Sequence, residues 1–301
     1  MSALPVPIQI GFLILLFFAG FIGRRVGWLT PAHAGRMLQL VMTVGLPALF
    51  IADVSRAPLH RALAALPISA ILIMLVTLGT AGFIGRRLQL PRATHGAFVL
   101  CSTLMNPSFL YPFVLAAWGR DAFAMLALFD LGNTLMLGTA IYAIAATYGG
   151  HATGFVAILK RVLSFPPLWA LVAALALNLS DTQLPAMVTT VLGTAGRLIL
   201  LLVVLALGVL FDARLLRSRL LVAALALRIP LGLVLGLACA ELFGLTGLAR
   251  AVLLLGAAAP IGFSAVVIAN RESLDRDLAA SAASISVLLA LVYVPLALWL
   301  L

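Results

Sequence analysis

About ten apolar runs, each close to the length of a transmembrane helix, follow one another along almost the whole chain. An α-helix needs about 20 residues to cross the hydrocarbon core of a bilayer. The sequence therefore predicts an all-α membrane protein with ten transmembrane helices, which we number spans one to ten. Their approximate ranges are 7–23, 35–53, 65–84, 95–118, 122–148, 163–179, 186–210, 219–241, 247–269 and 277–300.

The shortage of charged residues supports this fold class. Only 9% of the 301 residues are charged and 64% are hydrophobic, whereas a soluble domain usually carries about 25% charged residues. The net charge of +10 comes from arginines in short clusters without interleaved aromatic residues, so nucleic acid is not an expected partner. Cys101 and Cys239 lie inside apolar runs, and without metal-ligand spacing neither a metal nor a cofactor is expected.

The positions of the basic residues predict how the spans are oriented. Basic residues concentrate in the cytoplasmic loops of membrane proteins. Odd-numbered loops are therefore expected on the cytoplasmic side of the cell (inner) membrane, with both termini on the non-cytoplasmic side. In or beside these loops lie 13 of the 19 basic residues: Arg24, Arg25, Arg36, Arg86, Arg87, Arg92, Lys160, Arg161, Arg214, Arg217, Arg219, Arg271 and Arg276.

The span count also predicts an internal repeat. Ten spans divide into two five-helix halves, 1–150 and 151–301, and because five is odd the second half must be inverted relative to the first. Inverted repeats with broken helices near the midplane build many secondary transporters. Spans four and nine occupy corresponding places, and the expected fold has these two broken helices crossing.

Helix-breaking residues mark both of these spans. Proline inside a helix removes a hydrogen bond, and within a membrane the freed groups must be satisfied by protein or by a water-filled cavity. We expect an interruption in each span and a shared substrate site between them, although two ordinary kinks in packed helices are the alternative. The candidate substrate-binding residues are Asn106, Ser108, Pro112, Pro260, Gly262 and Ser264.

A charged residue inside span five is the second signal. Asp130 lies well inside the apolar run, and Asn133 follows three residues later on the same helix face. An ion at the centre of a transmembrane helix costs at least ~2.5–3.5 kcal/mol, so such residues usually face the protein interior. We expect Asp130 and Asn133 to form a polar network or a proton-coupling site.

Two arginines also lie inside predicted spans. Arg197 is a further candidate for substrate binding, where its loss would weaken a dianion more than a monoanion; the alternatives are a pair with Asp130 or a position at the outer interface. Arg228 either reaches the cytoplasmic headgroups, which is the favoured interpretation, or joins the site. Asp53 and Glu241 lie at span ends and are expected to meet water.

Several short motifs give the chain a resemblance to the auxin efflux carrier family, whose bacterial members include malate and malonate carriers. The likeness extends over nearly the whole length. The motifs are Gly27-Trp28-Leu29, Leu46-Pro47-Ala48-Leu49, the segment 106–112 running to Gly119, Phe129-Asp130 with Asn133, Pro166-Pro167, and Ala258-Ala259-Pro260 running to Ala269.

The resemblance implies that the two crossing helices meet at Pro112 and Pro260 beside the substrate, and that a scaffold part moves against a transport part. One departure concerns span four. The family usually has an asparagine seven residues before the proline and a glycine two before it, where this chain has Met105 and Leu110. Either the unwound turn is shifted by one residue or Asn106 does not take over the family's polar contact.

These observations predict a secondary active transporter or uniporter for a small organic anion, a carboxylate such as a dicarboxylate or an auxin-like aromatic acid. The alternative is a sodium-coupled organic-anion symporter of bile-acid-symporter-like architecture. An enzyme is not expected, because neither a nucleophile–base pair nor clustered carboxylates stand out. The expected partners are the anion and the lipid bilayer, with a second copy of the chain as a candidate for a homodimer.

Overall fold

The computed structural model describes residues 5–150, 154, 156, 160, 163–211 and 218–301. Within these ranges the chain is helical apart from turns, loops and one isolated β-bridge. Arg161, Arg214 and Arg217, which contributed to the predicted orientation, lie outside the described residues, as do 151–153 at the start of the predicted second repeat. The all-α prediction is confirmed over the described part of the chain.

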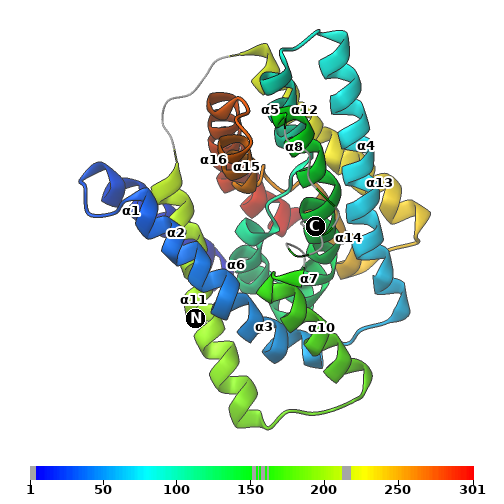
Figure 1. The fold of residues 1–301 in the computed structure, drawn as a ribbon. Coiled ribbons are helices and arrows are strands. Elements are labelled where there is room, and N and C mark those ends of the chain that lie inside the picture. Colours follow the sequence, from blue (N-terminus) through cyan, green and yellow to red (C-terminus); the bar gives the residue numbers. More distant parts are fainter. Residues whose placement is uncertain (1–4, 151–153, 155, 157–159, 161–162, 212–217) are drawn as a thin grey trace.

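The main helices follow one another along the chain in the order of their labels in Figure 1. They are α1 Val6–Arg25, α2 Pro31–Leu40, α3 Leu46–Asp53, α4 Ala65–Arg87, α5 Arg92–Thr103, α6 Pro107–Ala117, α7 Gly119–Met136, α8 Tyr142–Gly149, α10 Pro166–Leu179, α11 Ala186–Leu210, α12 Arg219–Arg228, α13 Pro230–Leu242, α14 Gly247–Ala257, α15 Ser264–Arg271 and α16 Arg276–Leu300. Short π-helical or 3-10 turns join α2 to α3 and α7 to α8, and flank the loop before α4.

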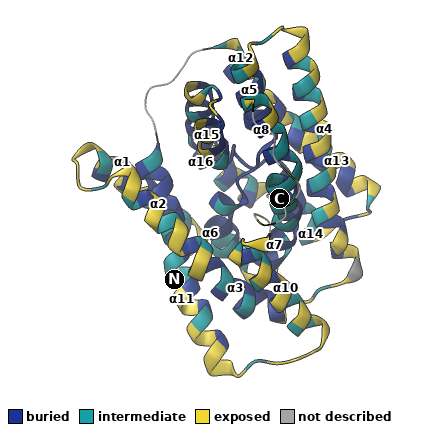
Figure 2. Ribbon diagram, in the orientation of Figure 1, coloured by how far each residue is buried: buried dark blue, intermediate teal, exposed yellow. Residues whose placement is uncertain are grey.

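Among the described residues, seven helical stretches are long and apolar enough to cross a membrane, and they coincide with predicted spans one, two, three, five, seven, eight and ten. They are Val6–Arg25, Pro31–Arg56, Ala62–Arg87, Gly119–Gly149, Ala186–Leu210, Arg219–Leu242 and Arg276–Leu300. Shorter apolar helices, α6, α10 and α14, lie in the remaining three predicted spans. Many large hydrophobic residues are exposed, which suits contact with lipid tails, and Figure 2 colours the exposed residues yellow.

The helices form two groups (Figure 1). The first, which we call the panel, consists of α1, α2, α3, α10 and α11, and α11 packs against α1, α2 and α3. Gly20 and Gly208 bring α1 and α11 close together, since a methyl group at either position would strike a backbone carbonyl of the other helix. Small residues at helix contacts are typical of membrane proteins. The second group, the core bundle, contains α4–α8 and α12–α16.

Predicted spans four and nine, both in the core bundle, are each interrupted by a non-helical segment, and the two segments touch. Residues 104–106 separate α5 from α6, and residues 258–263 separate α14 from α15. Met105 and Ile261 form an antiparallel bridge, and Gly262 N donates to Leu104 O at 3.2 Å. The two broken spans therefore contact each other at these segments, which we call the crossover.

One part of the expected crossover is wrong. Pro112 is expected where the two helices meet, but it lies inside α6, five residues after the helix begins at Pro107. Pro107 marks the break because a proline is favoured in the first turn of a helix, where its missing N–H has no partner to lose. The break therefore precedes the first proline of span four, and the turn at Pro112 is helical.

Candidate functional site

The second halves of both broken helices begin at one cavity. Asn106 caps α6, with its Oδ1 accepting a hydrogen bond from Phe109 N at 3.3 Å. Helix α15 begins at Ser264, next to Gly262 and Phe263. The first turn of a helix has backbone N–H groups without helical partners and carries the positive end of the helix dipole. Two positive helix ends therefore converge on the crossover.

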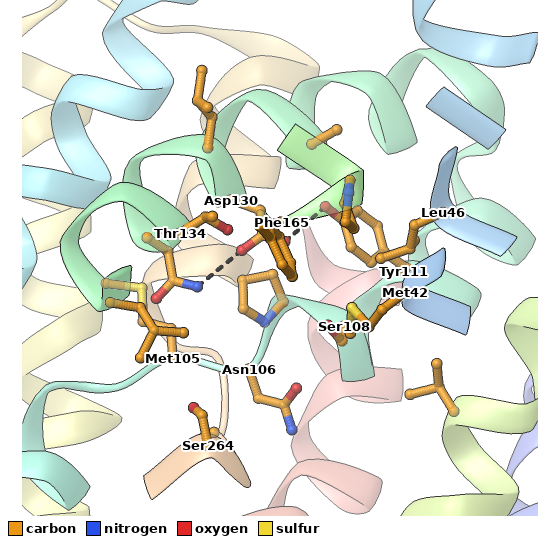
Figure 3. Close-up of a pocket in the computed structure, with 18 of the residues that line it drawn as sticks. Met42, Leu46, Met105, Asn106, Ser108, Tyr111, Asp130, Thr134, Phe165 and Ser264 are labelled. Atoms are coloured by element: carbon orange, nitrogen blue, oxygen red, sulfur yellow. Dashed lines mark hydrogen bonds between the residues drawn. The ribbon is translucent and has the colours of Figure 1, made fainter. Parts of the chain in front are cut away.

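The cavity has a volume of about 280 Å³ and lies between the panel and the core bundle. Its panel side is apolar, with Met42, Leu46, Leu168 and Leu207 among the lining residues. Its other side carries the polar groups: Asn106, Ser108, Tyr111, Asp130, Asn133, Thr134 and Ser264 (Figure 3). Cavities for small ligands are usually apolar with a few convergent polar groups, and this volume is at the small end of their range.

Asp130 is the acidic group of this cavity (Figure 3). Its Oδ2 accepts a hydrogen bond from the Tyr111 hydroxyl, and its Oδ1 accepts one from Asn133 Nδ2, both at 2.9 Å. Both donors are neutral, and the Tyr111 hydroxyl joins α6 to α7, whereas Asn133 lies on α7 with Asp130. Tyr111 was missed by sequence reasoning, although it stands three residues after Ser108, a spacing that puts both on one helix face.

Two polar atoms at the cavity have no partner among the described residues. Asn106 Nδ2 and Asn133 Oδ1 are both buried and form no hydrogen bond. A buried polar atom left unpaired costs about 1–3 kcal/mol. One free donor and one free acceptor beside two positive helix ends therefore fit a small polar ligand.

A second cavity, of about 430 Å³, lies between α1, α6 and α11 and contains Arg120, Arg197 and Pro112. Arg197 Nη2 and Arg120 Nε lie 3.3 and 3.5 Å from Asp53 Oδ1. The sequence-based alternative of an Arg197–Asp130 pair is wrong. So is the expectation that Asp53 meets water, because only 1% of its side chain is exposed. A 3-10 turn extends span two beyond Asp53, and α3 packs on α11.

Arg228 is fully buried, so the favoured interpretation that it reaches the headgroups is also wrong. Its guanidinium donates to Thr103 O at 3.1 Å and to Ala257 O. These carbonyls end α5 and α14, immediately before the two breaks. Arg228 points inward because α12 packs against α5. Glu241, by contrast, is 70% exposed and pairs with Arg250, as expected for a residue at a span end.

The structure thus sorts the candidate residues of the sequence into three places. Asn106, Ser108, Gly262, Ser264, Asp130 and Asn133 line the crossover cavity. Pro112 and Arg197 line the second cavity. Pro260 lies in the unwound segment between α14 and α15, next to the bridging residue Ile261.

Known proteins are similar to this chain over nearly its whole length. The model of a family described as membrane transport protein matches residues 5–299. An uncharacterized transporter of Methanothermobacter thermautotrophicus is 28% identical over 289 residues, which cover 94% of each chain. An uncharacterized transporter of Methanocaldococcus jannaschii is 24% identical over 310 residues, covering 98% of this chain and 99% of the relative. The chain is a multi-pass membrane protein, and it belongs to the membrane transport protein family, also called the auxin efflux carrier family.

Proposed function

We propose that the protein is a secondary transporter of a small carboxylate, which binds in the crossover cavity between the N-terminal ends of α6 and α15. The convergence of these two helix ends on one cavity is the observation that carries the proposal. Each end is equivalent to roughly half a positive charge. Helix ends of this kind bind anionic substrate groups in other transporters with broken helices.

We also propose that ten spans form two inverted repeats, 1–150 and 151–301. The protein then crosses the inner membrane with its odd-numbered loops in the cytoplasm. The matching breaks in spans four and nine support the repeat. The cavity is lined by Leu38, in the first half of the helical stretch Pro31–Arg56, and by Leu207, near the end of α11. The start of that stretch and the end of α11 adjoin odd-numbered loops, so under this orientation the cavity lies toward the cytoplasm.

Packed aromatic rings lie at the cavity wall. The ring of Tyr111 lies 6.2 Å from that of Phe50 and 5.0 Å from that of Phe123, measured between centroids. Pro112, the residue after Tyr111, lines the second cavity together with Arg197 and Arg120. We propose that the conformation described is inward-facing and that the two arginines form an entry site that attracts anions from outside.

Asp130 gives this carrier a means of coupling to protons. A bound carboxylate and an ionised Asp130 about 5 Å apart repel each other by roughly 3 kcal/mol at an effective dielectric constant near 20. The anion therefore binds best when Asp130 holds a proton, and anion and proton move together. Uniport driven by the membrane potential, worth ~2.3 kcal/mol per charge at 100 mV, is the second candidate.

Counterflow in proteoliposomes tests the proposed function. Labelled malonate, malate, succinate, benzoate and indole-3-acetate are offered at several pH values, with an organic cation such as choline as the comparison. We expect saturable exchange of at least one carboxylate, faster with an inward proton gradient and independent of sodium. Preferential exchange of the cation would contradict an anion carrier, and sodium-dependent exchange would favour the symporter alternative.

A further inference from the structure

The first halves of the two broken helices end inside the protein. Helix α5 ends at Thr103 and α14 at Ala257, and both residues lie at the crossover. The C-terminal end of a helix has carbonyl groups without helical partners and is equivalent to roughly half a negative charge. Two such ends together amount to about one negative charge. Carbonyls of this kind coordinate sodium ions in other transporters with broken helices.

In this protein the Arg228 guanidinium lies at these carbonyls. It donates to Thr103 O with Nη1 and to Ala257 O with Nη2. A guanidinium stays charged in proteins, and its fork of donors suits two acceptors at once. Arg228 is 0% exposed and forms no ion pair with a carboxylate of the described residues. Its full positive charge is therefore balanced by the two helix ends.

The sequence around Arg228 makes room for its side chain. Helix α12 ends at Arg228 and the chain bends before Pro230, which begins α13. Gly232, in the first turn of α13, packs against Arg228 and the Ala257 carbonyl. A methyl group at position 232 would lie 2.5 Å from Arg228 Nη2, so any larger residue there would displace the guanidinium. Gly232 therefore lets α13 approach both the guanidinium and the Ala257 carbonyl closely.

We propose that Arg228 is a built-in cation, which occupies the place of a bound alkali-metal ion between the C-terminal ends of α5 and α14 and makes the crossover independent of sodium. With these negative ends neutralised, the positive ends of α6 and α15 act on the substrate without opposition. The link to substrate rests on the proposed function, whereas the replacement of a bound cation does not, and it is tested without substrate.

The test measures the thermal stability of the purified protein in guanidinium, sodium, potassium or choline chloride at equal, low millimolar concentration. Wild-type protein is expected to show the same Tm in all four salts. In Arg228→Ala we expect Tm to fall by about 5 °C or more. Guanidinium restores part of that loss because it can refill the vacated position, and sodium restores part of it through the same carbonyls.

Matched variants separate charge replacement from general packing. Arg250→Ala removes a partly exposed arginine that pairs with Glu241, and we expect no cation-specific rescue. Arg228→Lys keeps a positive charge and should retain more stability than Arg228→Met, which keeps the volume but not the charge. If Arg228→Ala does not fold, the comparison of Arg228→Lys with Arg228→Met tests the proposal. An Arg228→Met protein as stable as Arg228→Lys would contradict it.

Two further results would overturn the proposal that Arg228 replaces a bound cation. One is a saturable, sodium-specific rise in the Tm of the wild-type protein. The other is a folded Arg228→Ala protein that no cation rescues. Because these measurements contain no substrate, their failure leaves the proposed anion transport standing. A failed carboxylate screen together with a successful cation rescue would remove only the proposed function.

Discussion

The two aspartates of spans two and five lie inside the protein, yet their surroundings differ in kind. Asp53 lies beside two guanidinium groups, those of Arg197 and Arg120. Asp130 accepts hydrogen bonds from two neutral donors, the Tyr111 hydroxyl and the Asn133 amide, at the wall of a cavity. A guanidinium group beside a carboxylate favours its charged form, whereas the carboxylate of Asp130 has no such cation among its hydrogen-bond partners. We therefore expect the partners, more than the depth, to decide which of the two carboxylates exchanges a proton.

The largest effect is expected from Asp130→Asn. The amide keeps the size of the side chain and an acceptor for the Tyr111 hydroxyl, so Tm should change little. The rate of uptake driven by a proton gradient should fall roughly tenfold or more, which corresponds to an activation free energy higher by at least ~1.4 kcal/mol. The remaining uptake should not vary with pH, because the exchanging proton is gone.

The matched control for this substitution lies on the same helix. Asp121 is exposed in the first turn of α7, and Asp121→Asn should keep the wild-type pH profile. An unchanged pH profile in Asp130→Asn would make Asp130 a bystander. A loss of rate together with a large fall in Tm would instead assign it to a buried structural network.

Asp53→Asn is expected to act on stability instead of on pH dependence. Breaking a buried ion pair typically costs about 3–5 kcal/mol. The arginine side chains of this cluster are 35% and 60% exposed and can turn to water, so we expect about 1–3 kcal/mol. A double-mutant cycle with Arg197→Gln should show a non-additive part, because the two substitutions remove the same contact. Strict additivity would show that the pair contributes nothing.

The smallest effect concerns Arg197 as an entry site. Arg197→Gln should raise the concentration needed for half-maximal uptake from the outside a few-fold, and more for a dianion than for a monoanion. The effect should shrink as ionic strength rises, because exposed charges are screened over about 8 Å at physiological salt. If half-maximal uptake shifts equally for both anions and does not depend on salt, Arg197 acts only through its ion pair with Asp53 and does not attract the substrate.

The elements of the fold that could be predicted were those that depend on local sequence. Apolar runs set most spans, and Pro107 and Pro260 mark the breaks because proline removes a backbone donor whatever surrounds it. Asn106, Ser108 and Ser264 could be named as site candidates because they stand next to those breaks.

Partners that are distant in sequence could not be predicted. Arg197 meets Asp53 across 144 positions, and Arg228 meets Thr103 across 125. Such contacts depend on which helices pack together, α11 on α3 and α12 on α5, and hydropathy does not encode that choice. The same limit hid the place of Arg228 at the ends of α5 and α14.

The central claim, that an anion binds at the N-terminal ends of α6 and α15, is tested most directly by Asn106→Asp. Aspartate caps a helix about as well as asparagine, so the substitution adds a negative charge at the start of α6 while keeping the cap. Asn270→Asp adds the same charge at an exposed position near the end of α15 and serves as the control.

Equilibrium binding of the carboxylate found by counterflow would be measured for the wild type and both variants at low salt, with Tm as the check on folding. We predict at least a tenfold loss of affinity in Asn106→Asp, which corresponds to ~1.4 kcal/mol or more, and near-wild-type affinity in Asn270→Asp. Undiminished carboxylate binding by a folded Asn106→Asp protein would contradict the site proposed at the crossover.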